Sequence, residues 1–123
     1  MKPHTIHGRI DEHGRVLLPV IVIASDGNEV EVEAAVSLEF GGAMAINEEL
    51  AKGLGWRRLG ARRVVVGFET VRMDHYLGTM SLGSEPQQVV VLGGIKRRAI
   101  IGEKFLSGRK LTLYFSTSEV VLE

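Results

Sequence analysis

Residues 32–42 are the most informative stretch of this chain for its fold, and they read Val32-Glu33-Ala34-Ala35-Val36-Ser37-Leu38-Glu39-Phe40-Gly41-Gly42. This pattern is an apolar strand that runs into polar residues and then into a glycine pair. The same order of strand, glycine pair and short helix returns between Val89 and Gly108. A glycine pair after an apolar strand is common, so the repeat by itself indicates only β structure.

Hydrophobic periodicity predicts many short strands on both sides of this stretch. Residues 16–24 are rich in β-branched side chains, and the turn signal Ser25-Asp26-Gly27-Asn28 joins them to the alternating residues 30–33 as a hairpin. Asn47 can cap a short helix that begins at Glu48 and ends at a following glycine. Further strands are predicted at 6–10, 62–66, 71–81, 87–92, 111–115 and 120–122, with a second short helix at 103–106.

Composition favours one compact domain over residues 1–123, a length that can bury a core. Fifteen glycines punctuate the strands, and the pattern predicts an all-β fold: a small closed or orthogonally packed β-barrel with one or two short helices. Fifteen basic and fifteen acidic residues cancel, so the overall charge favours neither nucleic acid nor a membrane surface as a partner. The absence of Cys excludes disulfides and thiolate chemistry.

No stretch of the sequence reads as a signal peptide or a membrane span. The longest apolar run, residues 16–24, contains Pro19 and is too short to cross a bilayer. We therefore expect a cytoplasmic protein. We also expect no cofactor and no metal, because a solvated N-terminal strand and its turn account for His4, His7, His13 and Asp11.

The stretch at 32–42 resembles the active-site segment of bacterial retropepsin-like aspartic proteases, in which an apolar strand leads into Asp-Thr-Gly, an aromatic residue and a glycine. Four further segments are similar to the family in the same order along the chain: Gly8 to Asp11, Gly14 to Val20, Tyr76 to Thr79 and Ala99 to Leu106. The resemblance covers nearly the whole chain. It implies a single retropepsin-like lobe.

The catalytic triplet of that family is replaced here by Ser37-Leu38-Glu39. The resemblance implies two aspartates, one from each subunit of a homodimer, that share a proton and activate water. Ser37 stands in place of the aspartate and has no useful basicity at neutral pH. Leu38 replaces a Thr whose hydroxyl bonds across the dimer, and Glu39 replaces a Gly that permits close backbone approach. We therefore expect a catalytically degenerate homologue that binds a peptide or protein partner.

The resemblance further implies a flap turn at Gly67-Phe68-Glu69-Thr70, over a cleft whose floor is Ser37 to Gly42, with Gly41 and Gly42 among its binding residues. An extended peptide could add to strand edges in such a cleft, with Phe68 in contact with it. An ordinary hairpin with an exposed aromatic, or a core Phe68, is the structural alternative. We expect a homodimer, or a mixed dimer with an active paralogue, because the lobe is short and the apolar strands at 6–10 and 120–122 need pairing.

Two alternative chemistries exist at the triplet. Glu39 lies two residues after Ser37, so in an extended strand both side chains would share one face, and two Glu39 carboxylates could form a displaced dyad of an active peptidase. The second alternative is that Ser37 acts as a nucleophile. The sequence has no Gly-x-Ser-x-Gly motif around Ser37, and the one His outside the N-terminal region is His75.

A different functional class rests on Asp11 to Pro19, which also resembles the opening of swapped-hairpin transcription factors of the antitoxin type. Residues 20–23 continue as strand where that class has a basic residue and a helix, so DNA binding is the weakest hypothesis. Basic clusters that flank turns are interpreted as solvated faces: Arg57-Arg58, Arg62-Arg63 and Lys96-Arg97-Arg98.

Overall fold

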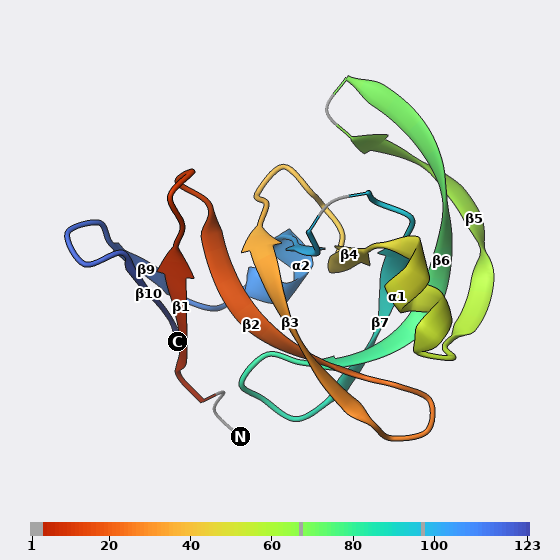
Figure 1. Ribbon diagram of the computed structural model, residues 1–123, viewed down its shortest axis with the longest axis horizontal. Helices are drawn as coiled ribbons and strands as arrows, with labels where there is room; N and C mark the ends of the chain where they lie inside the picture. Colours follow the sequence, from red (N-terminus) through yellow and green to blue (C-terminus); the bar gives the residue numbers. More distant parts are fainter. Residues whose placement is uncertain (1–3, 67, 97) are drawn as a thin grey trace.

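The computed structural model describes residues 4–66, 68–96 and 98–123. Strands dominate these residues, together with two short helices (Figure 1). In chain order the elements are β1 (Ile6–Ile10), β2 (Val16–Ile23), β3 (Glu29–Val36), β4 (Met44–Ile46), α1 (Glu48–Gly53), β5 (Arg57–Val66), β6 (Glu69–Ser81), β7 (Gln87–Gly93), β8 (Ile100–Ile101), α2 (Glu103–Leu106), β9 (Leu111–Tyr114) and β10 (Glu119–Leu122).

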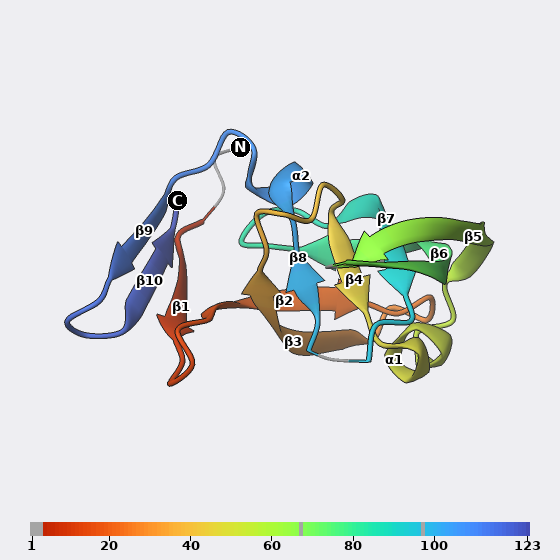
Figure 2. The same ribbon diagram turned by 90° about the horizontal axis from the view of Figure 1, so that it is seen from above.

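The strands form one mixed sheet in the order β5-β6-β7-β4-β8-β3-β2-β1-β10-β9. An additional antiparallel pairing of β2 with β6 joins two distant members of this order, so β2, β3, β8, β4, β7 and β6 pair around a closed ring. Figure 2 shows β1, β9 and β10 as a flank at one end of this ring, while α1 and the β5–β6 hairpin lie at the other. The all-β prediction is confirmed.

Apolar side chains that alternate along the ring strands form the main core. On β2, Leu18, Val20 and Val22 are fully buried, and on β6 Met80 is as well. Trp56 joins the same cluster, and its indole Nε1 donates a hydrogen bond of 2.7 Å to the carbonyl of Ile23. The tryptophan is therefore a core residue that also fixes the end of β2, since a buried indole N–H needs an acceptor.

Both helices lie where local signals predict them. The Asn47 side chain accepts a hydrogen bond of 2.8 Å from the backbone N–H of Leu50, which caps α1 at its N-terminus. Lys52 pairs with Glu48 at 2.9 Å, one turn apart. Gly55 follows the helix at φ +69°, in the left-handed region that favours glycine.

Three strand assignments differ from the sequence prediction. β5 begins at Arg57 rather than at Arg62, because its first half carries charges and a bulge at Gly60 that hide the strand pattern. β4 and β8 were not predicted, since strands of three and two residues show no periodicity. Their partners are distant in sequence: β4 pairs in parallel with β7, and β8 with β3.

The terminal strands are paired within the chain, which corrects one reason for expecting a dimer. β1 lies between β2 and β10, and β10 also pairs with β9. The swapped-hairpin alternative is also wrong for the fold, because β2 pairs with β1, β3 and β6 of the same chain. Within residues 4–66, 68–96 and 98–123, neither helix combines the length and apolarity that a membrane crossing needs.

Candidate functional site

The substituted triplet forms a tight turn directly after β3. The backbone N–H of Ser37 donates to the carbonyl of Ile101 at 2.9 Å, which extends the β3–β8 pairing by one residue. The N–H of Phe40 then donates to the carbonyl of Ser37 at 3.3 Å and closes the turn, so Leu38 and Glu39 occupy its corner. This corrects the expectation that Ser37 and Glu39 share one face of an extended strand, because the chain is not extended there.

Backbone hydrogen bonds from the start of α2 hold the turn and the residues that follow it. The N–H of Glu103 donates to the carbonyl of Phe40 at 3.1 Å, and the N–H of Gly102 donates to the carbonyl of Ala43 at 2.9 Å. A Cβ on Gly102 would lie far inside van der Waals contact with the carbonyl oxygens of Phe40 and Gly42. Glycine therefore permits this close backbone approach.

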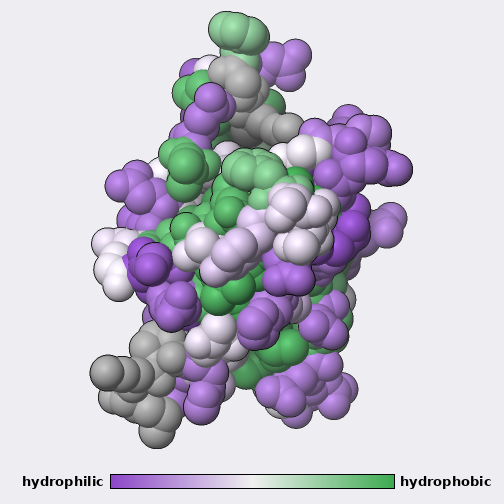
Figure 3. Space-filling model, turned by 90° about the vertical axis from the view of Figure 1, so that its left-hand side faces the viewer, coloured by the Kyte–Doolittle hydropathy of each residue, from purple (hydrophilic) through white to green (hydrophobic). Residues whose placement is uncertain are grey.

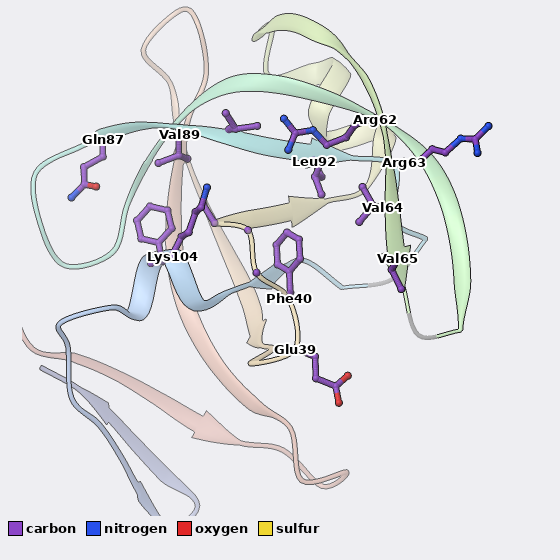
Figure 4. Close-up of a pocket in the computed structure, with 15 residues that line it drawn as sticks. Glu39, Phe40, Arg62, Arg63, Val64, Val65, Gln87, Val89, Leu92 and Lys104 are labelled. Carbon is purple, nitrogen blue, oxygen red and sulfur yellow. The ribbon is translucent and has the colours of Figure 1, made fainter.

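A cavity of about 590 Å³ opens above this segment (Figure 4). Its walls come from residues 39–43, from β5, from β7 and from the start of α2; the side chains or backbone of Glu39, Phe40, Gly41, Gly42, Ala43, Arg62, Arg63, Val64, Val65, Gln87, Val89, Val90, Leu92, Lys104 and Phe105 line it. We call this cavity the cleft. A smaller cavity of about 200 Å³ shares Glu39, Phe40, Val64 and Val65 with it and is also lined by Ser37.

The triplet residues differ in how they face these cavities. Ser37 is half-buried and lines the smaller one only. Leu38 lines neither, and 74% of its surface is exposed. Glu39 lines both, yet its carboxylate points away from the cleft in Figure 4. Gly41 and Gly42, expected to form the floor, do line the cleft.

The β5–β6 hairpin forms the wall opposite the triplet. Val64 and Val65 of β5 line both cavities, and Val65 is 72% exposed. Phe68, Glu69 and Thr70 at the tip are exposed and line neither cavity, and the ring of Phe68 is fully in solvent. The core alternative for Phe68 is therefore wrong. The remaining predicted flap residue, Gly67, lies outside the described residues.

Basic side chains gather at the cleft, which the sequence patterns did not indicate. Of the residues that the structure describes, three cations line it, Arg62, Arg63 and Lys104, against one carboxylate, that of Glu39. In Figure 4, Arg62 and Lys104 extend toward the middle of the cleft from different walls, whereas Arg63 points away. Their convergence could not be predicted from sequence because α2 and β5 are distant along the chain.

One arginine of each of the other two basic clusters forms an ion pair. Arg58 bonds to Asp74 at 2.9 Å. Arg98 and Arg9 both bond to Glu33, at 2.6 and 2.8 Å. The hydrogen bond from Arg9 and the second one from Arg98 hold the pKa of Glu33 below its ordinary value.

The N-terminal turn uses its acidic residue for structure. One oxygen of Asp11 accepts backbone hydrogen bonds from His13 at 2.9 Å and Arg15 at 2.8 Å, and the other accepts from the Arg15 guanidinium at 2.7 Å. Burial alone would raise the pKa of Asp11, but these bonds outweigh it and lower the pKa to about 2. Within residues 4–66, 68–96 and 98–123, no group of three or more His, Asp or Glu could hold a metal ion.

Comparison with known proteins bears on the fold. No family model matches the sequence, and the curated proteins give no match. A solved structure does match: the crystal structure of a retropepsin-like aspartic protease from Rickettsia conorii aligns with a TM-score of 0.66, over 98% of this chain and 91% of that chain. The fold is retropepsin-like. At 15% identity the likeness shows the fold alone, so the chemistry of this chain rests on its own residues.

Proposed function

We propose that this retropepsin-like domain binds an extended peptide, or an extended segment of a protein partner, in the cleft and does not hydrolyse it. The observation that carries the proposal is the Ser37 turn, which offers a hydroxyl where the resemblance implies an aspartate. Water activation in such sites needs two carboxylates close enough to share a proton. Among the described residues that line the cleft, Glu39 is the one carboxylate, and it points away from the cleft.

Binding by strand addition is supported by the position of β5. This strand stands at the end of the sheet order, so along one side it pairs with no other strand of the described chain. Residues 62–65 of β5 also line the cleft. An extended segment in the cleft could therefore pair with free backbone groups of β5, a mode in which backbone bonds give affinity and side-chain contacts give selectivity.

Apolar surface in the cleft supports the same mode. Val65 and Val90 are exposed by 72% and 41%, and both line the cleft together with the half-buried Phe40. Exposed valines inside a concave surface are a favourable site for the alternate side chains of a bound strand. We also propose that a second subunit, a copy of this chain or an active paralogue, completes the cleft.

The test is a peptidase assay paired with a binding assay on the same purified protein. We expect no cleavage of peptide libraries between about pH 3 and about pH 7, since a hydroxyl alone cannot supply general-base catalysis over this range. We expect measurable binding of extended peptides by fluorescence anisotropy. Absence of binding by every peptide would contradict the proposal, whatever the peptidase result.

The alternative function is an active peptidase that uses Glu39. It is favoured by the observation that Glu39 lines both cavities. Its signature would be pepstatin-sensitive hydrolysis that disappears in Glu39→Gln. Glu49→Gln, the same change at an exposed glutamate of α1 that lines neither cavity, serves as the matched control and should leave any such hydrolysis in place.

A further inference from the structure

The charge of the cleft differs from that of the whole molecule. The chain carries equal numbers of basic and acidic residues, yet three basic side chains and one acidic side chain of its described part line the cleft. Of these, the ends of Arg62 and Lys104 extend toward its middle, and the carboxylate of Glu39 points out of it (Figure 4). The interior of the cleft is therefore a local site of positive charge.

No carboxylate of the described chain neutralises these cations. The salt bridges among residues 4–66, 68–96 and 98–123 involve Arg9, His13, Arg15, Lys52, Arg58 and Arg98, and none involves Arg62, Arg63 or Lys104. Phe40, Leu92 and Phe105 line the cleft together with Arg62 and Lys104, whose own side chains are exposed to water. An anionic group that entered between them would relieve their repulsion and gain charge-assisted hydrogen bonds.

We propose that the cleft selects extended segments in which an acidic side chain stands between apolar residues. This inference rests on the proposed function and specifies its ligand. The acidic group lies opposite Arg62 and within reach of Lys104, while apolar side chains of the segment pack on Val64, Val90 and Phe40. Such a segment is a different chemical class from the neutral apolar segment that the valines alone would accept.

The position of Arg62 within β5 indicates that the acidic group is a side chain within the bound segment rather than the carboxyl terminus of that segment. β5 runs from Arg57 to Val66, so Arg62 has strand on both sides of it. A segment added along β5 would pass Arg62 and continue, which places a side chain opposite the guanidinium. Opposite charges that face each other across paired strands stabilise the pairing, and like charges destabilise it.

The experiment uses pools of peptides of about ten residues, with ends acetylated and amidated so that a single central residue sets the charge. That residue is Glu, Gln or Lys, and the flanking positions are mixtures of apolar residues and Thr. We expect the full chain to bind the Glu pool about 5- to 10-fold more tightly than the Gln pool, and the Lys pool more weakly still. Raising NaCl from about 50 to about 500 mM should reduce the preference for Glu.

Substitutions of single cations test which of them cause the preference for the Glu pool over the Gln pool. Arg62→Gln should bring the affinities for the Glu and Gln pools to within about 2-fold of each other. Lys104→Gln should also reduce the ratio of these two affinities. Arg72→Gln is the matched control: it removes the same charge from the same hairpin at an exposed residue that lines neither cavity. Arg62→Glu should bind the Lys pool better than the Glu pool.

The outcomes separate this inference from the function on which it rests. Equal binding of the Glu and Gln pools would overturn acidic selection and leave peptide binding intact. An equal loss of preference in Arg72→Gln would overturn it as well, because the effect would then be one of overall charge. Failure of all three pools to bind would contradict both proposals. Displacement of the Glu pool by an equal concentration of a single-stranded oligonucleotide would assign the cations to phosphate and refute the acidic peptide.

Discussion

Gly102 lies where the backbone of α2 approaches the floor of the cleft. A Cβ at this position would meet the backbone carbonyls of Phe40 and Gly42, which cannot rotate away as a side chain could. We predict that Gly102→Ala lowers the free energy of unfolding by about 1–3 kcal/mol, the usual cost of overpacking, and also weakens peptide binding because the floor must shift. Chemical denaturation beside a binding titration measures both effects.

Gly41 provides the control for that substitution. It lies on the same segment, yet a Cβ there would meet nothing within 4 Å. Gly41→Ala should change the free energy of unfolding by less than about 0.5 kcal/mol, as expected of an open surface position. Equal destabilisation by the two alanines would show that the contact at Gly102 is unimportant.

Asp11 gives the protein a pH-dependent contribution to stability. Its pKa is about 2 in the folded protein, whereas an Asp in an unfolded chain titrates near about 3.9. A depressed pKa means that the ionised group stabilises the fold fully above the unfolded value, and that this contribution is lost as pH falls toward the folded value. We predict that the difference in urea midpoint between wild type and Asp11→Asn stays constant from pH 7 to about pH 5 and falls to about half at pH 3. A difference that is independent of pH would contradict the assignment.

The β5–β6 hairpin is the element whose tip projects freely beside the cleft. In both Figure 1 and Figure 2 it lies at the opposite end of the molecule from the β9–β10 hairpin. Figure 3 views the β9–β10 side, where apolar and polar side chains intermingle on the surface. Each hairpin ends in an exposed aromatic, Phe68 on one and Phe115 on the other, which permits a matched comparison.

Phe68→Ala should weaken binding of a true partner by about 1–3 kcal/mol, as expected of an exposed aromatic at a binding site. The melting temperature should stay nearly unchanged, because the ring is fully exposed and its removal leaves no cavity. Phe115→Ala should change neither quantity. Thermal melts and anisotropy titrations of the two variants provide the test. Equal losses of binding in both variants would show that the tip of the β5–β6 hairpin is not part of the binding site.

Local chemistry explains which elements could be predicted from the sequence. The cap at Asn47 and the turn at Ser25 to Asn28 act within a few residues, so α1 and the β2–β3 hairpin lie close to their predicted positions. β4 and β8 exist because of partners far along the chain, and no local pattern marks them. The cleft was predicted in part: Gly41 and Gly42 line it, but register decides that Val64 of the hairpin faces it, and packing alone brings Lys104 and Arg62 to one cavity.

For the molecule as a whole, we predict a dimer in solution that forms through the side bearing the substituted triplet. Leu38 is 74% exposed beside the cleft, and a second subunit would remove this apolar surface from water. Light scattering at micromolar concentration should report twice the mass of one chain, and Leu38→Asp should reduce it to one. Phe115→Asp should leave the dimer intact. A monomeric wild type would refute the proposal, and dissociation by Phe115→Asp alone would move the interface to β9.

The closed ring of strand pairings has a consequence for how the chain reaches its native state. β2 must find β6, β3 must find β8, and β1 must find β10 near the opposite end of the chain. Each of these pairings requires a loss of chain entropy on loop closure before its contacts stabilise the native state. Refolding should therefore take milliseconds to seconds rather than microseconds. During that time the apolar faces of β2 and β7 stand unpaired, and the yield of refolded protein should fall as its concentration rises, while a rapid dilution should recover it.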